Sequence, residues 1–383
     1  SSFDFTMQKR ANRWYDPGYL EKLPEARYTM PSLKLGGSPL YFESVSILGS
    51  YNKKNTSTST PDTNTSNPDT HFNRLDAENK ISLPVKVAFI NLAPFVGNRE
   101  TFYDKDAYGQ SAIRTIFFSG VDLSTKFYRL FDVKSNFLGM DLNGLRHVIT
   151  PTIAYYYGHR PTVTKNNLRQ VDDIDALTQS NYAAIALSNK LQTKRRGQSV
   201  DVVDFRISTT YNFRPVMDEN LNKNGSSFSD FLLELKLLPY SWLRIDSDAT
   251  YDHKEGYFKE VNNDLNFQFA EERSVGIGQR YERKGGKQVT LNLNWRLNPK
   301  WKFAIYERYQ FADVPGLNKK GLREQQYSIS RDMHCWVTEL TFNDSKSEGQ
   351  SIWVIFRLKA FPEMEFGFDQ SYHKPESGHQ ANP

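Results

Sequence analysis

The chain has 383 residues, of which 38% are hydrophobic, and its formal net charge at pH 7 is +5. A mean hydropathy of −0.64 excludes a helical membrane protein, since no stretch approaches the roughly 18 uncharged apolar residues of a spanning helix. The small net charge gives no argument for nucleic acid as a partner. Aromatic residues are frequent at 14%, which suits strands and the interfacial girdles of outer-membrane barrels.

Alternating apolar and polar side chains predict β-strands through the first half of the chain, because a period of two separates the side chains onto two faces. Residues 111–133 are one long strand or two shorter ones, and we favour one that overhangs the bilayer. Residues 98–110 are interpreted as a segment leading out to solvent. The polar, low-complexity segment 52–70 cannot bury a core and predicts a solvated loop. The predicted strands cover residues 2–10, 27–35, 40–51, 71–82, 84–94, 111–133, 145–157, 182–192 and 200–213.

Three carboxylates, those of Asp172, Asp173 and Asp175, lie in the long connection 158–180. A divalent cation could bind such a cluster, but the glycine and the terminal glutamate of a calcium-binding loop are missing. A solvated loop is therefore the favoured interpretation, and no metal site is predicted.

The clearest alternation lies in the second half, at residues 287–311. Apolar residues such as Val289, Leu291 and Leu293 alternate there with polar ones, on both sides of a tight turn at 298–300. Each run has about 11 residues, the length of a strand tilted through a bilayer. We interpret this stretch as a transmembrane β-hairpin. Further strands are predicted at residues 228–237, 242–251, 257–269, 274–281, 323–330, 335–342 and 351–359.

Connection lengths alternate along the chain between short turns and longer loops, as in an outer-membrane barrel with periplasmic turns and extracellular loops. The fold class predicted is all-β, a large antiparallel transmembrane β-barrel with about 18 strands in this chain. The barrel portion is assigned to residues 1–359, and 360–383 to a C-terminal periplasmic tail that contains a further alternating segment at 364–372.

The polar residues between the apolar ones of the hairpin are candidate lumen-facing residues: Asn292, Asn294 and Arg296. Nothing in the sequence supports catalysis, because there is no G-x-S-x-G motif and the seven histidines are scattered without metal-ligand spacing. We therefore expect a protein that is not an enzyme, without catalytic residues and without a cofactor.

Five segments, at residues 23–44, 74–103, 145–157, 187–213 and 331–336, resemble in order and spacing the barrel of the LptD family of lipopolysaccharide-assembly proteins. The family-motif positions that carry a structural role by this resemblance are Pro24, Arg146, His147 and Pro151. The resemblance implies a 26-stranded barrel in the bacterial outer membrane, of which this chain is the C-terminal portion. The jellyroll domain and roughly the first eight strands would precede it.

The resemblance also implies a function and its partners. Lipopolysaccharide would be inserted into the outer leaflet through the barrel lumen and a lateral seam between the first and last strands. The implied partners are lipopolysaccharide, a plug lipoprotein similar to LptE, outer-membrane lipid, and periplasmic Lpt bridge proteins that reach the barrel through the missing N-terminal domain. The last strand of the seam would carry Ile352, Val354, Phe356 and Leu358.

Cys335 is the single cysteine of the chain, which excludes an internal disulfide. Many members of the family carry two adjacent cysteines at the corresponding turn, bridged to the N-terminal domain. Cys335 is by this resemblance a candidate for one such bridge, and the alternative is a buried or rim thiol without a partner.

A general porin-like channel for small solutes is the alternative function. About 18 strands would close a cylinder of porin size without any missing part. The family segments, and a chain that begins in mid-strand without a signal peptide, favour the lipid conduit.

Overall fold

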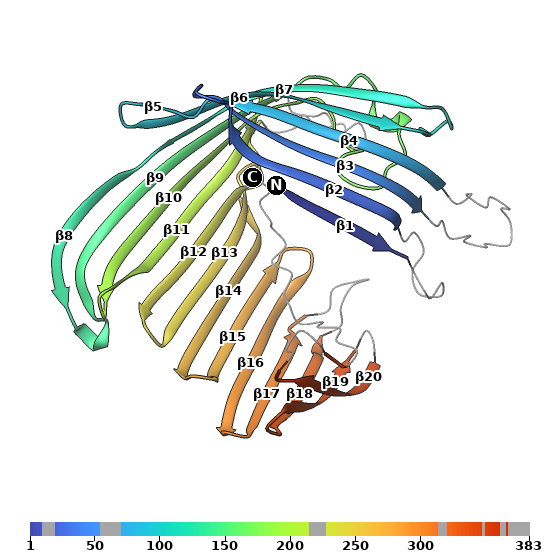
Figure 1. Cartoon of the computed structure of the whole chain (residues 1–383). Coiled ribbons are helices and arrows are strands. Elements are labelled where there is room, and N and C mark those ends of the chain that lie inside the picture. Colours follow the sequence, from blue (N-terminus) through green and yellow to red (C-terminus); the bar gives the residue numbers. More distant parts are fainter. Residues whose placement is uncertain are drawn as a thin grey trace. The chain divides into compact units, whose positions relative to one another are not determined.

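The computed structural model describes residues 1–9, 20–53, 70–213, 227–312, 320–346, 349–360 and 365–366. These residues form an all-β chain with 21 antiparallel strands and two 3₁₀ helices, η1 (Phe137–Gly139) and η2 (Lys165–Asn167) (Figure 1). In this part of the chain, neither helix has the length needed to cross a bilayer. The predicted segment 52–70 and tail 360–383 lie mostly outside the described residues.

The chain divides into two compact units. Unit 1 consists of Ser1–Phe127, Ile149–Leu187 and Ser208–Ser229, and unit 2 of Tyr128–Val148, Ser188–Ile207 and Asp230–Pro383. Whole strands in unit 1 are β1 (Ser2–Gln8), β2 (Leu20–Lys34), β3 (Tyr41–Lys53), β4 (Thr70–Ser82), β5 (Val85–Val87), β6 (Ile90–Tyr103) and β7 (Ala112–Thr125).

Whole strands in unit 2 are β12 (Phe231–Tyr240), β13 (Leu243–Asp252), β14 (Tyr257–Ala270), β15 (Arg273–Glu282), β16 (Gly286–Asn298), β17 (Trp301–Gln310), β18 (Gly321–Asp332), β19 (Trp336–Ser345), β20 (Gly349–Leu358) and β21 (Glu365–Phe366). Four strands contribute residues to both units: β8 (Phe127–Ser135), β9 (Leu142–Gly158), β10 (Ser180–Arg195) and β11 (Gln198–Asn212).

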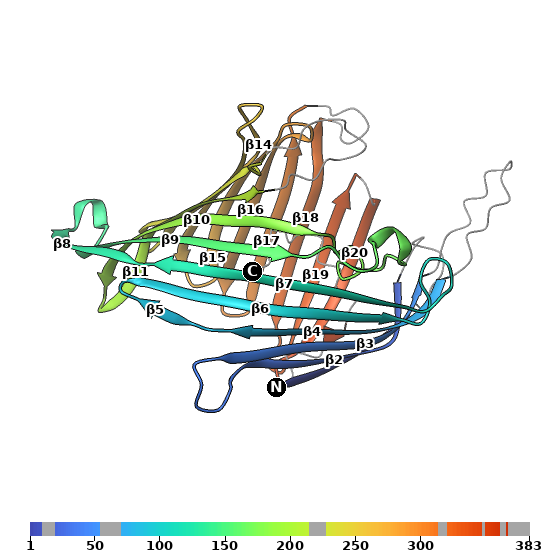
Figure 2. The ribbon, with the colours of Figure 1, turned by 90° about the horizontal axis from the view of Figure 1, so that it is seen from above.

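Most strands pair with their neighbours in sequence, so that β2, β3, β4, β6 and β7 lie side by side in both ribbon views (Figures 1 and 2). Three strands are exceptions. The short strand β5 forms a hairpin with β6, β8 continues the direction of β7 after Lys126, and β21 has only two residues. Without these three, 18 long strands remain among the described residues, in agreement with the number predicted.

Two strand boundaries were wrongly predicted. Residues 111–133 are not one strand, because β7 ends at Thr125 and β8 begins at Phe127. Residues 84–94 do not form a single strand, because a turn at Ala88, with a positive φ of 54°, separates β5 from β6. Strand β6 then runs on to Tyr103, through residues expected to lead out to solvent. Pro94 lies inside β6, where its carbonyl accepts a hydrogen bond from the Leu83 amide at 2.9 Å. The apolar composition of this region hid the turn.

The strands of unit 1 have one apolar and one polar face, as the alternation predicts. Leu48, Leu75, Phe102 and Ile113 are paired neighbours across β3, β4, β6 and β7, and all four are exposed. The next row on the opposite face contains Ile47, Asp76, Thr101 and Arg114, and all four are buried. Exposed apolar side chains in register across several strands are typical of a surface that contacts lipid.

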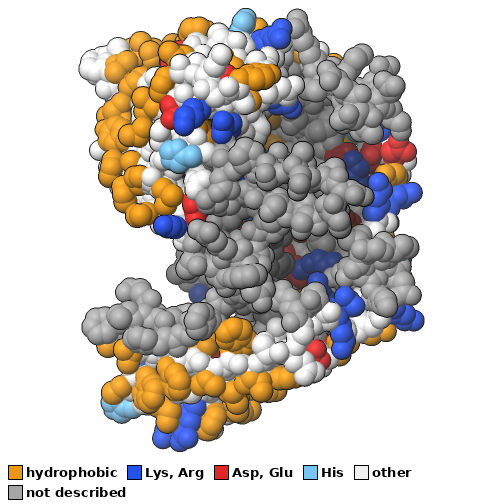
Figure 3. Space-filling model, turned by 90° about the vertical axis from the view of Figure 1, so that its right-hand side faces the viewer, with side chains coloured by type: hydrophobic (Ala, Val, Ile, Leu, Met, Phe, Trp, Pro, Cys, Tyr) orange, Lys and Arg blue, Asp and Glu red, His pale blue; other side chains and the backbone are white. Residues whose placement is uncertain are grey.

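The same two faces occur in unit 2. Five apolar residues form one row across β16 to β20, and the adjacent row on the other face is mainly polar. The apolar row is Trp295, Phe303, Ile329, Leu340 and Val354, and the adjacent row is Asn294, Ala304, Ser328, Thr341 and Trp353. Hydrophobic side chains accordingly gather in bands on the surface drawn in Figure 3.

In each unit we call the end of the strands with the tightest connections the turn end, and the opposite end the loop end. In unit 2 the short connections include 241–242, 271–272, 299–300 and 333–335, and the longer ones include 311–320. Glu272 and His334 occupy the left-handed region in two of these tight turns, with φ of 59° and 70°. The loop-end connections 253–256, 283–285 and 346–348 are nearly as short as the turns, so the predicted sidedness is only partly present in unit 2.

Aromatic rings cover glycines on the polar face of unit 1. Phe95, Phe118 and Tyr156 lie side by side, with ring centroids 5.9–6.5 Å apart. A Cβ added at Gly97 would meet the Phe118 ring and the Asn79 carbonyl, and one at Gly120 would meet the Phe95 ring and the Tyr155 carbonyl. The two glycines therefore make room for the aromatic rings of neighbouring strands.

Candidate functional site

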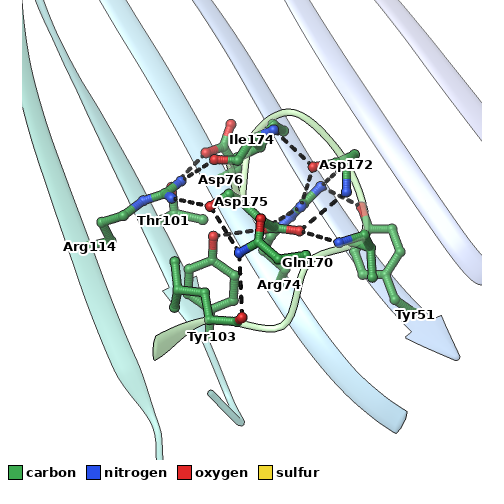
Figure 4. A network of polar contacts seen from close by, with 12 residues as sticks. Tyr51, Arg74, Asp76, Thr101, Tyr103, Arg114, Gln170, Asp172, Ile174 and Asp175 are labelled. Atoms are coloured by element: carbon green, nitrogen blue, oxygen red, sulfur yellow. Dashed lines mark hydrogen bonds and ion pairs between the residues drawn. The ribbon is translucent and has the colours of Figure 1, made fainter. Parts of the chain in front are cut away.

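The connection between β9 and β10, residues 159–179, packs on the polar face of β3, β4, β6 and β7 (Figure 4). Its first residues extend the sheet, because the His159 amide donates to the Phe117 carbonyl at 2.8 Å. The Thr115 amide then donates to the Thr162 hydroxyl at 2.9 Å. Further on, the Ala107 amide donates to the Asn167 carbonyl at 3.0 Å. We call this segment the anchored loop.

Arg74 on β4 is the centre of the anchorage, and its side chain is fully buried. The guanidinium donates to Asp172 through two parallel hydrogen bonds, Nη1 to Oδ1 at 2.7 Å and Nη2 to Oδ2 at 2.5 Å. Nη1 also donates to Asp175 Oδ1 at 2.8 Å, and Nη2 to the Tyr51 hydroxyl at 3.1 Å. A forked arginine pair of this kind fixes both position and orientation.

Asp175 is the second anchor, and its side chain is also fully buried. The Tyr103 hydroxyl donates to Oδ1 at 2.8 Å, and the Val171 amide donates to Oδ2 at 3.0 Å. Arg114 holds the backbone beside it, with Nη2 donating to the Ile174 carbonyl at 2.6 Å. The carboxylate of Asp175 therefore joins strand side chains to the loop backbone.

An apolar cluster excludes water from one side of these ion pairs. Leu168 of the anchored loop packs with Tyr51, Phe72 and Tyr103, and all four are buried. The Tyr51 and Phe72 rings lie 5.5 Å apart, and Phe72 and Tyr103 6.3 Å apart. Reduced access of water strengthens the charge interactions beside the cluster.

The charge state of Asp172 follows from its neighbours. Burial alone would raise its pKa, but the hydrogen bonds and positive charge of Arg74 outweigh burial and hold the pKa below its usual value. The carboxylate is therefore ionised at neutral pH. Each charge in this network is stabilised by its opposite partner. Loss of Arg74 would therefore leave Asp172 and Asp175 without their cation.

The anchored loop corrects the expectation of a solvated segment at 158–180. Asp172 and Asp175 bind Arg74, while Asp173 is exposed. Sequence reasoning missed the partner because Arg74 lies 98 residues from Asp172. A usable signal was present: Arg74 and Asp76 are charged residues on one face of a strand whose other face contains Leu75, Ala77 and Ile81.

The predicted lumen-facing residues share the polar face of β16. Asn292 and Asn294 are exposed, and the Asn294 amide donates to the Asn292 side-chain oxygen at 3.0 Å. Arg296 forms an ion pair with Glu272 at 2.6 Å. Their position on a lumen wall stays a prediction.

The predicted seam residues Ile352, Val354, Phe356 and Leu358 all lie exposed on the apolar face of β20. One edge of β20 pairs with β19 along its whole length. At the other edge, the described residues show only the pairing with β21, at Phe356 and Arg357.

Cys335 is exposed in the turn between β18 and β19, with its sulfur 3.5 Å from His334 Nδ1. Of the family-motif residues, Pro24 lies at an irregularity in the pairing of β2 with β3. Arg146 of β9 donates to Gln192 at 2.7 Å. His147 and Pro151 lie half-buried in the same strand. The disulfide and the structural roles stay predictions.

The LptD family, described as LPS transport system D, matches residues 17–301 of this chain in sequence. The chain belongs to the LptD family. As a member of the LptD family it is a non-enzymatic outer-membrane β-barrel protein with a role in lipopolysaccharide transport. No curated protein matches the chain.

Among solved structures, mutants of the Rh. blastica porin are similar to this chain. One is 13% identical, with 78% of this chain and 92% of the porin covered and a TM-score of 0.32. Another mutant of this porin is 12% identical, with 92% of this chain and 100% of the porin covered and a TM-score of 0.33.

Proposed function

We propose that the protein is the part of the outer-membrane translocon that inserts lipopolysaccharide into the outer leaflet, with the sugar head carried in the lumen and the acyl chains released through a lateral seam. Membership of the LptD family over residues 17–301 supports this proposal most directly. The two-faced strands support it further. In this proposal the apolar face contacts lipid, the polar face lines the lumen, and the turn end lies at the periplasm.

The mechanism requires no bond chemistry. A lipid with a charged sugar head cannot cross hydrocarbon, where each unsatisfied polar group costs several kcal/mol. A polar lumen removes that cost for the head, while the chains need an exit into lipid. A strand edge with few ladder hydrogen bonds is the least costly place to open a sheet.

The exposed apolar residues of β20 are consistent with such an exit. Ile352 is 70% exposed and Val354 51% exposed, which suits contact with acyl chains. The anchored loop contributes at the loop end, because it covers the polar face of β3, β4, β6 and β7. A head group moving along that face would meet this cover and be directed away from the extracellular opening.

The partners proposed are a plug lipoprotein similar to LptE in the lumen and periplasmic Lpt bridge proteins that act through an N-terminal domain. Exposure of Cys335 in a turn-end connection is compatible with a disulfide to that domain. Replacement of Cys335 by Ser would then change the mobility of the full-length protein on a non-reducing gel. Unchanged mobility would exclude the disulfide and leave the transport proposal standing.

Depletion of the full-length protein tests the transport function. Lipopolysaccharide labelled on the surface of intact cells should fall, while uptake of small hydrophilic solutes is measured in the same cells. Normal surface lipopolysaccharide with reduced solute uptake would contradict the conduit and support the porin-like channel.

Photo-crosslinking tests the seam. A photoreactive amino acid at Ile352 or Val354 of β20 should crosslink to lipopolysaccharide in growing cells. The matched control is Leu293, which lies on the apolar face of β16 away from the proposed exit. Equal crosslinking at all three positions would show contact with bulk membrane lipid and exclude a seam at β20.

A further inference from the structure

A charged cavity of about 470 Å³ lies at the turn end of unit 2, on the polar face of β16 to β20. Five cationic side chains line it: Arg296, Lys300, Lys302, Arg357 and Lys359. Three anionic ones accompany them: Glu272, Asp332 and Glu339. The cavity therefore carries two more positive than negative charges, and its volume is within the range of small-ligand sites.

Glu272 holds the central cations of this cavity. Its carboxylate accepts from Arg296 Nη1 at 2.6 Å and also pairs with Lys302. The hydrogen bond and charge of Lys302, together with Arg296, lower the pKa of Glu272, so the carboxylate is ionised. The Glu272 carboxylate thus lies between two cations, and a phosphate group could take the same position. A phosphate carries more negative charge than a carboxylate and has a third oxygen that can accept a hydrogen bond.

The other three cationic side chains of the cavity are those of Arg357, Lys359 and Lys300. Arg357 pairs with Glu339 at 2.8 Å, and Lys359 pairs with Asp332 at 2.6 Å. The ammonium group of Lys300, in the turn after β16, has no partner among the described residues. It supplies a positive charge that no carboxylate of the cavity neutralises.

We propose that this turn-end cavity binds the phosphate groups of a phosphorylated sugar, the head of the transported lipid. This inference rests on the proposed function for the identity of the sugar. Phosphate oxygens would replace the Glu272 carboxylate between Arg296 and Lys302, and Lys300 would bind a free oxygen. The cavity would thereby hold the head at the periplasmic end of the lumen before it moves further.

The alternative to a ligand site is a set of surface ion pairs at the strand ends that binds no ligand. Such pairs contribute only a little to local stability. The two interpretations predict opposite effects for one substitution. Glu272→Gln removes the competing carboxylate, so a phosphate site should bind more tightly by about tenfold, the effect of one charge-assisted hydrogen bond. If the ion pairs are only structural, Glu272→Gln would remove one pair and would not raise the affinity for phosphate.

Isothermal titration of the full-length protein in detergent measures this, with glucosamine disaccharide bisphosphate as the probe. The unphosphorylated disaccharide and inorganic phosphate are the comparison ligands. Lys300→Gln should weaken binding of the bisphosphate several-fold. Lys346→Gln, an exposed lysine at the loop end of the same strands, is the matched control and should leave binding unchanged.

Each outcome decides the inference. Tighter binding by Glu272→Gln and weaker binding by Lys300→Gln support it. Equal affinity for the bisphosphate and inorganic phosphate would assign the cavity to free phosphate and overturn the lipid-head assignment. No binding, or binding that neither variant changes, would overturn the site itself. If depletion of the protein still lowers surface lipopolysaccharide in that case, the transport function stands without this cavity.

Discussion

Arg74 of β4 binds Asp172 of the anchored loop through two parallel hydrogen bonds, although 98 residues separate them in the sequence. The guanidinium is fully buried, whereas the carboxylate keeps about a third of its surface exposed. Asp175, which is also fully buried, shares the same guanidinium. Arg74 therefore joins both carboxylates of the loop to β4, and its substitution tests this part of the anchorage.

Arg74→Met should release the anchored loop. The substitution keeps much of the side-chain volume but leaves the buried Asp175 without its cation, a loss of about 3–5 kcal/mol in local stability. Hydrogen–deuterium exchange should become faster in residues 159–179. Arg244→Met is the control, because Arg244 pairs with Asp246 at an exposed site, where the loss is about 0–1 kcal/mol. Unchanged exchange in the loop of Arg74→Met would contradict the anchorage.

Acidification should detach the loop in a defined pH window. Because the pKa of Asp172 is lowered in the folded protein, its contribution is complete above its usual value of 3.8 and is lost as the pH falls further through the lowered value. A spin label at Ala176→Cys, in a Cys335→Ser background, should be immobile at pH 6 and become mobile only when the pH falls well below 3.8. In Asp172→Asn the label should respond less to this change. A label equally immobile at both pH values would count against the pair.

Gly120→Ala should destabilise the polar face of unit 1. The added Cβ would meet the Tyr155 carbonyl and the Phe95 ring, and such overpacking costs about 1–3 kcal/mol. A Cβ at Gly37 meets no atom within 4 Å, so Gly37→Ala is the matched control. The temperature of unfolding in detergent should fall for Gly120→Ala only. Equal values for the two variants would show that the rings can move aside.

Substitutions at adjacent positions of β16 test which face contacts lipid. Leu293→Arg places a charge on the apolar face near the middle of the strand, where arginine costs about 2–4 kcal/mol in a bilayer. Asn292→Arg places it on the polar face, where water remains accessible. Folding yield into lipid vesicles should fall for Leu293→Arg and be nearly unchanged for Asn292→Arg. The reverse order would mean that the faces are wrongly assigned.

The strands could be predicted from the sequence because a two-residue period is a local property. It located the hairpin of β16 and β17, the two-faced rows and the number of long strands. It failed where most residues are apolar, as in residues 83–96, because such a stretch does not show where the chain turns. The turn at Ala88 was missed for this reason.

The anchored loop could not be predicted because its contacts are not local. Asp172, Asp173 and Asp175 resemble a solvated acidic segment until Arg74 and Arg114 are brought beside them by strand pairing. The charged turn-end cavity was missed for a similar reason. Arg296 was recognised as polar, but Glu272 lies in the turn between β14 and β15, and Arg357 lies on β20.

The distance in sequence between Arg74 and its two carboxylates also constrains the order of assembly. Three intervening long strands, β6, β7 and β9, must be in place before residues 159–179 can reach β4, and closure of so long a segment is slow compared with formation of a hairpin. We therefore expect the burial of Arg74 to be a late event in assembly. Protection of the Arg74 guanidinium from solvent would show that the N-terminal strands have reached their final register. This readout does not depend on any measurement of transport.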